Sequence, residues 1–261
     1  MGYNFGFYPY SKEGEPAPIR WKVLLKQEKS VLLITESGID ALPFFKAPPS
    51  PLSAKNWNAE ADDPNFVENL VLAKSKKIFD ENGNVYLDVF GRPITDKKYR
   101  GFPLWYVVNW ENSTLRAYLN GPFLDTAFTA EERARLKVLN VRNLPNPINP
   151  AVDSGPDTQD YVALLDFENA KRYFPQSVQR KCRPTPYAAS KEGLFLHSDG
   201  FASWWLRTAG IWEPFNPKEE FRPSNKHCMC TVNNDGVIDI MGMSAETIRC
   251  IRPIIHVKLK N

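Results

Sequence analysis

The stretch that decides the fold reads Ser203-Trp204-Trp205-Leu206-Arg207-Thr208-Ala209-Gly210. Successive side chains of a β-strand point to opposite faces, so Trp204 and Leu206 would share one face, and Trp205 and Arg207 the other. The first face suits a buried core. The second sets a guanidinium beside an indole, which predicts either a structural clamp or the edge of a binding site.

Strands are predicted at both ends of the chain. Apolar and β-branched runs indicate an N-terminal meander and a β-rich last third. The expected strands cover residues 5–10, 19–25, 31–35, 161–165, 203–207, 229–233, 237–241 and 251–259. Asn234-Asp235-Gly236 is typical of a hairpin turn between two of the last strands.

Short helices are predicted in the middle of the chain. The clearest covers 110–121, with Ser113 or Asn112 as its N-cap and Gly121 just after its end. A second helix is expected to start at the capping residue Thr129 and to reach about Leu139. Further helix starts are indicated by the capping side chains of Asp166 and Thr185. Because strands and helices are segregated along the chain, the predicted fold class is α+β.

We expect one domain over residues 1–261, with an insertion at 46–104. The insertion carries its own predicted hairpin, in which Ile78–Asp80 and Val85–Val89 flank an Asn-Gly turn. The polar residues of this turn do not predict a calcium site. An EF-type loop needs its glycine at the sixth position, whereas Gly83 would stand at the fourth.

Composition excludes several classes of protein. Hydrophobic residues make up 43% of the chain and charged residues 24%, which is typical of a globular protein rather than a disordered one. A net charge of +3, with no Lys/Arg run longer than two, is too mild for a nucleic-acid interface. No apolar run approaches the roughly 18 residues that span a bilayer, so we predict no membrane insertion.

The sequence gives two expectations for cellular location. The N-terminus has neither the basic segment nor the apolar segment of a signal peptide. We therefore expect a cytoplasmic protein if the chain is full length, and an extracellular or cell-surface protein if a leader has been removed. The 4 Cys are few for 261 residues and indicate reduced thiols rather than a disulfide framework.

Several motifs occur in a characteristic order along the chain. They are Phe5-Gly6-x-Tyr8-Pro9, Ile19-x-Trp21-x-Val23-Leu24, Trp110-Glu111-Asn112-Ser113-Thr114-Leu115-Arg116-x-x-Leu119-Asn120, Ala127-Phe128, Thr158-Gln159-Asp160, Trp204-Trp205-Leu206-Arg207 and Arg252-Pro253. Their combination resembles a bacterial family, domain of unknown function 6273. The resemblance extends over nearly the whole chain outside 46–104, and it implies no catalytic residues.

The order of motifs near the C-terminus is also similar to that of the C-type-lectin and formylglycine-generating-enzyme folds. Those families place a Trp-rich strand, an Asn-Asp-Gly type of turn and a terminal strand with an Arg in the same order. The similarity implies a C-type-lectin-like core of antiparallel sheet, and it concerns the fold alone. It further implies that Phe5–Tyr8 lies near Ile251–Val257. The chain departs from the pattern in Ala209-Gly210 and in its Cys-x-Cys.

Candidate ligand-binding residues gather around the central stretch and the hairpin turn. They are Trp205, Arg207, Trp212, Asn233, Asn234 and Asp235. Exposed aromatic residues beside an arginine are common anchors of recognition surfaces. A calcium-dependent sugar site is the sharper alternative, with Glu213-Pro214-Phe215-Asn216 as its first half, but an ordinary loop is favoured. A structural role is favoured for Arg207 and Arg252.

A second candidate is His227-Cys228-Met229-Cys230, which has the residue types of a metal site. A closed zinc site needs four ligands, and further ligands would have to come from Cys182, Cys250, His197 or His256. Copper held by two thiolates is the other possibility. Two small thiols buried in a β core are favoured, so we predict no metal and no cofactor.

These observations favour a non-catalytic module that binds an unknown ligand, either a carbohydrate or a protein surface. The first alternative is a formylglycine-generating-like or other metal- or thiol-dependent enzyme that uses Cys228 and Cys230. The second is a structural or assembly protein of phage or cell-surface origin. No nucleic-acid partner is expected.

Overall fold

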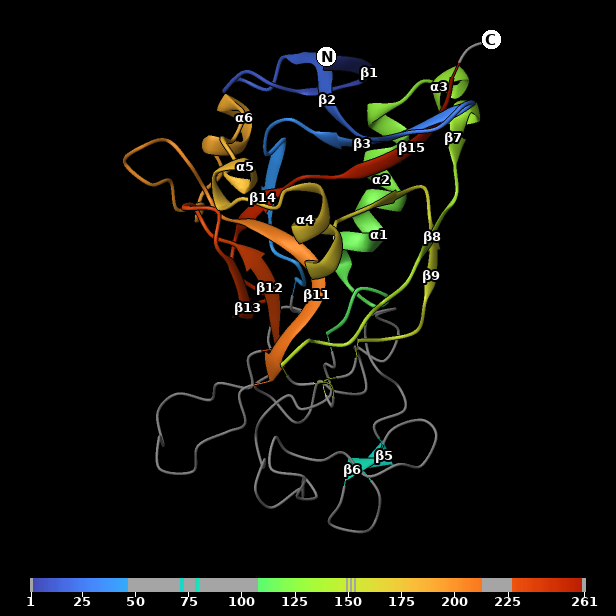
Figure 1. Ribbon diagram of the computed structural model, residues 1–261. Helices are drawn as coiled ribbons and strands as arrows, with labels where there is room; N and C mark the ends of the chain where they lie inside the picture. The colour runs from blue at the N-terminus through green and yellow to red at the C-terminus, as the bar shows by residue number, and fades with distance from the viewer. Residues whose placement is uncertain are drawn as a thin grey trace.

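The computed structural model describes residues 2–46, 71–72, 78–79, 108–148, 150, 152, 154–212 and 227–259 (Figure 1). Within these residues the chain combines mostly antiparallel sheets with short helices, which confirms the predicted α+β class. Most of the 46–104 insertion lies outside the described residues. Its described part is a ladder between β5 (Val71–Leu72) and β6 (Ile78–Phe79). The predicted hairpin with Val85–Val89 lies outside the described residues.

The first sheet joins the N-terminal meander to strands from later in the chain. Its order is β1-β2-β3-β15-β10, with β7 also paired to β15, and every pair is antiparallel. The strands are β1 (Gly2–Pro9), β2 (Pro16–Lys26), β3 (Ser30–Thr35), β7 (Leu136–Lys137), β10 (Val162–Ala163) and β15 (Ile254–Lys258). The predicted meander is therefore confirmed.

The second sheet is built around the stretch that opened the sequence analysis. Its order is β13-β12-β11-β14-β4, and the β11–β14 pair is parallel, with Trp204 opposite Cys250. The strands are β4 (Asp40–Leu42), β11 (Trp204–Trp212), β12 (His227–Val232), β13 (Ile238–Ser244) and β14 (Arg249–Ile251). The predicted Asn234-Asp235-Gly236 turn joins β12 to β13, with Gly236 at φ 86°, a conformation that favours glycine.

The helices follow the predicted caps closely. Ser113 accepts from the Arg116 N–H at the start of α1 (Thr114–Asn120), and Thr129 and Glu132 form both halves of a capping box on α3 (Ala130–Arg135). The helix after Thr129 is shorter than predicted because the chain turns into β7 at Leu136. The remaining helices are α2 (Pro122–Ala127), α4 (Phe167–Tyr173), α5 (Ser177–Arg180) and α6 (Pro186–Ala189).

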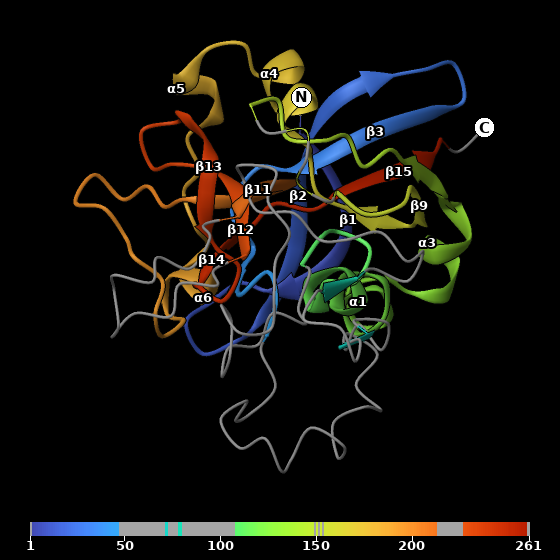
Figure 2. The same cartoon turned by 90° about the horizontal axis from the view of Figure 1, so that it is seen from below.

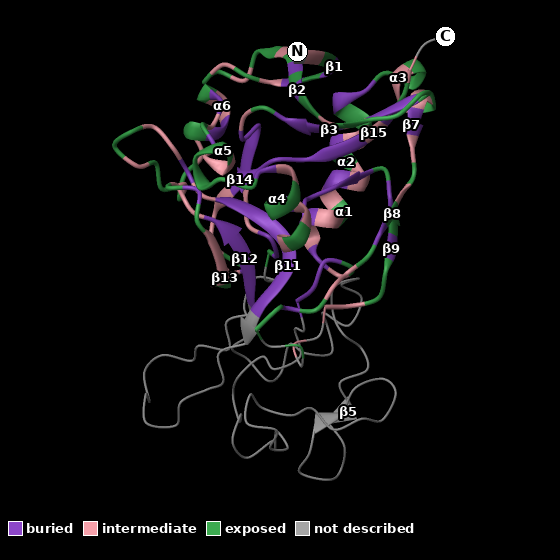
Figure 3. Cartoon of the chain, in the orientation of Figure 1, coloured by how far each residue is buried: buried purple, intermediate pink, exposed green. Residues whose placement is uncertain are grey.

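The helices divide between the two sheets. Helices α1 and α2 contact β10 and β1 of the first sheet, while α4 and α6 contact β11 and β4 of the second (Figures 1 and 2). Figure 3 shows that the buried residues concentrate in β11, β12, β3 and β15. A separate two-stranded ladder joins β8 (Leu139–Val141) to β9 (Thr158–Asp160). Within the described ranges, no helix has the length and apolar character to span a membrane.

Two neighbouring segments carry the chain from one sheet to the other. The chain leaves the first sheet after Thr35 and enters the second at β4, and it returns from β14 to β15 through Arg252-Pro253. Arg252 donates from Nε and Nη2 to the Thr35 carbonyl at 3.2 and 2.9 Å, and the Thr35 N–H donates to the Pro253 carbonyl. These bonds agree with the structural role that the sequence favours for Arg252.

The two terminal strands do not pair directly. Phe5–Tyr8 and Ile254–Val257 contribute to the first sheet, whereas Ile251 ends β14 of the second, and β2 and β3 lie between β1 and β15. The two segments therefore lie in the same sheet without being neighbouring strands. The physical reason is the register between β15 and β3, in which Ile254 faces Ile34 and Lys258 faces Ser30.

A buried carboxylate organises the Trp110–Asn120 motif. Asp160 accepts hydrogen bonds from Trp110 Nε1 at 2.9 Å, Thr158 Oγ1 at 2.7 Å and Arg116 Nε at 2.7 Å. Arg116 also donates to the Glu111 carbonyl at 3.1 Å. The motif therefore places α1 against β9 through one acceptor, and Arg116 has a structural role in it.

Replacing this acceptor should destabilise the fold. Asp160→Ala leaves the indole N–H and the guanidinium without their partner, so we expect a loss of about 3 kcal/mol in the free energy of unfolding. Urea unfolding measures it. The control is Glu111→Gln, an exposed change in the same motif, which should stay within about 0.5 kcal/mol of the parent. A loss below that of the control would contradict the proposed role of Asp160.

Candidate functional site

The central stretch is buried rather than exposed. Trp204 and Trp205 have no exposed surface, and Arg207 is 7% exposed. Trp205 donates from Nε1 to the Leu42 carbonyl at 2.9 Å and packs edge-on against Phe44. The exposed aromatic and arginine face that the sequence suggested is therefore not formed by Trp205 and Arg207.

Arg207 is a structural clamp between the two sheets. Its guanidinium donates to the Leu164 carbonyl at 2.6 Å, to the Arg142 carbonyl at 3.1 Å and to the Asp166 carboxylate. Asp166 also caps α4 by accepting from the Asn169 N–H. Burial lowers the pKa of Arg207, while the charge of Asp166 opposes that shift. Of the two alternatives for this face, the contacts favour the clamp.

The other candidate residues lie on or near the β12–β13 hairpin. Asn233 and Asn234 are half-buried and Asp235 is exposed. The Asn233 N–H donates to the Val237 carbonyl, and Asp235 accepts from the Val237 N–H at 2.9 Å. Trp212 is the last residue of β11, and its side chain lies outside the described part, as does Glu213–Asn216. Ligand contact by the turn stays a prediction.

The Cys-x-Cys pair belongs to the core. Cys228 and Cys230 are buried on β12. Cys230 donates weakly to the Ala209 and Ile240 carbonyls, both at 3.5 Å, and burial raises the pKa of its thiol to about 12. In the part of the chain that the structure describes, no three side chains of His, Cys, Asp or Glu are grouped to hold a metal ion.

A buried carboxylate with two tyrosines forms a different candidate site. Tyr8 donates from its hydroxyl to Asp40 Oδ2 at 2.6 Å, and the hydroxyls of Tyr8 and Tyr118 lie 2.6 Å apart. The Ala41 N–H donates to Asp40 Oδ1 at 2.7 Å. The pairing of Asp40 with Ile251 holds the carboxylate on β4, while β1 and α1 supply the two phenols.

Lys191 and Tyr187 complete this cluster from the α6 side. Lys191 donates from Nζ to the Tyr187 hydroxyl at 2.7 Å, and Nζ lies 3.7 Å from Asp40 Oδ1. Thr185 caps α6, and the Tyr187 N–H donates to the Tyr10 carbonyl, which ties the helix to β1. We call Tyr8, Asp40, Tyr118, Tyr187 and Lys191 the tyrosine–aspartate cluster.

The electrostatics of the cluster are dominated by burial. Burial raises the pKa of Asp40, although the bonds from Tyr8 and the Ala41 N–H and the charge of Lys191 act against it. Burial also raises the pKa of Tyr8 and Tyr118. For Lys191, burial acts to lower the pKa, but the bond to Tyr187 and the charge of Asp40 raise it above its usual value. At neutral pH the cluster therefore keeps its phenols protonated and its lysine charged.

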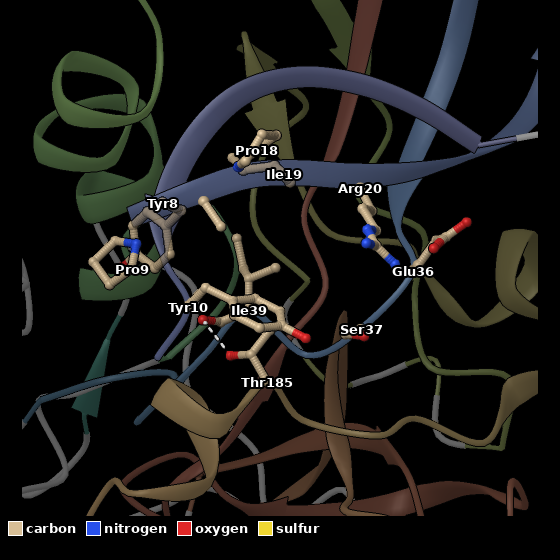
Figure 4. A pocket seen from close by; sticks show the side chains of 11 residues that line it. Tyr8, Pro9, Tyr10, Pro18, Ile19, Arg20, Glu36, Ser37, Ile39 and Thr185 are labelled. Carbon is tan, nitrogen blue, oxygen red and sulfur yellow. Dashed lines mark hydrogen bonds between the residues drawn. The ribbon is translucent and has the colours of Figure 1, made fainter. Parts of the chain in front are cut away.

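A small groove of about 90 Å³, partly open to solvent, lies beside the cluster and shares Tyr8 with it. Its lining comes from β1, β2, the segment after β3 and the N-cap of α6: Tyr8, Pro9, Tyr10, Ala17, Pro18, Ile19, Arg20, Glu36, Ser37, Ile39 and Thr185. Figure 4 shows the rings of Tyr8, Pro9 and Tyr10 toward one end, and Arg20 and Glu36 at the other. Of the described residues that line the groove, none is among the six predicted site residues.

Sequence reasoning missed this cluster for a physical reason. In the sequence, Tyr8 is marked only by a short motif, and Tyr118 falls at an unspecified position of another. Asp40 and Lys191 carry no local pattern, and they meet because β4 and α6 pack together. The signal that could have found the site is an isolated acidic residue within an otherwise apolar stretch, Ile39-Asp40-Ala41-Leu42.

In this α+β fold the motifs around Trp110, Arg207 and Arg252 make core contacts, whereas Tyr8, Pro9 and Ile19 of the N-terminal motifs line the groove. The family model named Domain of unknown function (DUF6273) matches residues 94–259. The chain therefore belongs to this family. The match contains the Trp110–Asn120, Trp204–Arg207 and Arg252-Pro253 motifs, whereas Tyr8 and Asp40 precede it. Comparison with curated proteins and with solved structures found no match.

The buried carboxylate gives a pH dependence of known sign. Because the pKa of Asp40 is raised in the folded state, the folded chain binds more protons than the unfolded chain above the unfolded pKa of about 3.9. Stability from Asp40 is therefore present at low pH and falls as pH rises through the folded pKa. The unfolding free energy of the parent minus that of Asp40→Asn should therefore decrease from about pH 4 upward, because only the parent loses stability as the carboxyl ionises.

Urea unfolding at a series of pH values measures this difference. Glu192→Gln, an exposed change next to Lys191, is the matched control and should leave the pH profile parallel to that of the parent. A pH-independent difference for Asp40→Asn would show that the carboxyl titrates normally.

Proposed function

We propose that this chain is a non-catalytic ligand-binding module with a C-type-lectin-like core, and that its ligand is a carbohydrate or a protein surface. The observation that carries the proposal is the groove along β1 and β2. Ligand sites are typically concave, with apolar and aromatic walls and a few polar groups that set orientation. The groove has both components, with Tyr8 and Tyr10 as aromatic residues and Arg20, Glu36 and Ser37 as polar ones.

The walls of the groove are held rigidly. Tyr8 is fixed by its bonds to Asp40 and Tyr118, and Tyr10 by backbone bonds to Glu15 and to Tyr187. Tyr10 is nevertheless 49% exposed, so its ring is available to a ligand. A preformed wall loses little conformational entropy on binding, which favours affinity. A phenol ring packs on the apolar face of a sugar as readily as on a proline or aliphatic side chain.

The thiol-dependent alternative finds less support. Burial raises the pKa of Cys230 to about 12, and the nucleophilic form of cysteine is the thiolate. The finer C-type-lectin-like assignment is supported by the two mostly antiparallel sheets and by the placement of both terminal strands in one sheet. Trp212 and the Asn233–Asp235 turn remain a second proposed contact surface, on the other sheet from the groove. An assembly protein of phage or cell-surface origin would bind its own copies or a shell protein instead.

Binding can be tested with a glycan array and the full chain, probed with and without calcium. For any sugar that binds, Tyr10→Ala should weaken the affinity at least about tenfold, or 1.4 kcal/mol, because aromatic anchors carry most interface energy. Titration calorimetry measures the change. Phe195→Ala, an aromatic residue that is 65% exposed and lies outside the groove lining, should bind like the parent.

Two results would count against this proposal. Equal affinity for Tyr10→Ala and the parent would remove the groove as the binding site. An array without any bound sugar in both conditions would exclude a carbohydrate ligand and leave a protein surface as the proposed ligand. Self-association of the purified chain would then favour the assembly-protein alternative.

A further inference from the structure

Two further cysteines meet in the core, away from the Cys-x-Cys strand. Cys182 precedes α6 and Cys250 lies on β14, and neither side chain is exposed. Their backbones are held by adjacent residues, since the Ala202 N–H donates to the Cys182 carbonyl and the Cys250 N–H to the Ser203 carbonyl. Both sulfurs lie against the same side of Gly38, and the Cys182 thiol also donates weakly to the Arg183 carbonyl at 3.7 Å. The backbone bonds to Ala202 and Ser203 therefore bring the two cysteines close together.

Gly38 provides the space for this pair. A Cβ atom at position 38 would lie 2.8 Å from Cys250 Sγ and 3.3 Å from Cys182 Sγ. The Gly38 backbone is itself fixed, because its N–H donates to the Arg183 carbonyl and its carbonyl accepts from Thr185. A larger residue could not be accommodated here without moving one of the sulfurs.

A buried cation with an incomplete set of acceptors lies beside the two thiols. Arg252 is 3% exposed, and its Nη1 has no hydrogen-bond partner among the described residues. Its other nitrogens donate to the Thr35 and Glu36 carbonyls, and its guanidinium stacks over Trp204 and Phe174. No described carboxylate lies within ion-pair distance of it. The ionisable groups that act on it most strongly are Cys182 and Cys250, ahead of the exposed Glu36.

This arrangement selects the charge state of the pair. A guanidinium does not lose its proton in a protein, and a buried charge without a counterion is costly. Burial acts to raise the pKa of Cys182, but the neighbouring Cys250 side chain and the charge of Arg252 bring it below its usual value. The neighbouring Cys182 side chain, together with burial, raises the pKa of Cys250. The surroundings therefore favour the thiolate of Cys182 over that of Cys250.

We propose that Cys182, Cys250 and Arg252 form a buried redox site, in which Arg252 holds Cys182 as a thiolate and a peroxide converts the two cysteines to a disulfide. The Cys182 sulfur attacks one peroxide oxygen, which breaks the O–O bond, releases hydroxide and leaves a sulfenic acid. The Cys250 thiol then displaces water from that sulfur. The two electrons lost by the sulfurs reduce one peroxide molecule to water, and a dithiol reverses the step.

Burial also sets the kind of oxidant. Neither sulfur is exposed, so a small peroxide can reach the pair through local opening, whereas a bulky disulfide such as oxidised glutathione cannot readily come within reach of the thiolate. The product would join the segment before α6 to β14. Because α6 carries Tyr187 and precedes Lys191, the cross-link would fix the element that closes the tyrosine–aspartate cluster.

The first test is treatment of the folded full chain with hydrogen peroxide, followed by alkylation under denaturing conditions and peptide mass mapping. We expect a Cys182–Cys250 disulfide that dithiothreitol removes, and much less product with oxidised glutathione. Cys250→Ser should stop at a sulfenic acid on Cys182, which dimedone traps. The double change Cys228→Ser with Cys230→Ser is the matched control and should still form the cross-link.

The second test reads the charge state without oxidation. The ultraviolet thiolate absorbance of the folded chain at neutral pH should disappear in Cys182→Ser and persist in the Cys228→Ser, Cys230→Ser control. Arg252→Lys keeps the charge and should keep part of this absorbance. The proposal is overturned if Cys182→Ser leaves the absorbance unchanged, or if peroxide yields no Cys182–Cys250 link in a chain whose circular dichroism shows it to be folded.

Discussion

The bonds from Arg252 to the Thr35 and Glu36 carbonyls hold the point where both sheets share a corner. Two strands of the first sheet, β3 and β15, continue across this corner into β4 and β14 of the second. A chain that changes sheet leaves backbone carbonyls without ladder partners, and buried carbonyls need donors. One planar guanidinium supplies several donors in a fixed geometry, so it suits this position better than a lysine would. Arg207 makes a similar connection through the Leu164 carbonyl and Asp166.

The fold was predictable where the signal was local. Ser113, Thr129 and Asp166 cap helices at the places that the sequence indicated, and the Asn-Asp-Gly turn closes the expected hairpin. Helix α2 was missed because its six residues are too few to show a period. The pattern of Trp204 to Arg207 also identified a strand correctly. It did not reveal burial of both faces, because the partners of Arg207 come from segments many residues earlier in the chain.

The candidate site was less predictable than the fold because it has no local pattern. The tyrosine–aspartate cluster takes its members from β1, β4, α1 and the α6 region, and only three-dimensional packing brings them together. The sequence motifs around Asp160, Arg207 and Arg252, in contrast, make core contacts. Tyr8, Asp40 and most of the groove precede the residues that the family model matches.

The pairing of β3 with β15 has a consequence for how the chain acquires its structure. Residues Ser30–Thr35 are almost entirely buried, yet one of their two hydrogen-bonding neighbours is Ile254–Lys258, near the far end of the described chain. During synthesis the N-terminal hairpins emerge long before that neighbour exists. Until it arrives, β3 presents an apolar strand edge that other chains can pair with. The first sheet is thus completed last, and slow, aggregation-prone folding is the cost of closing it with a distant strand.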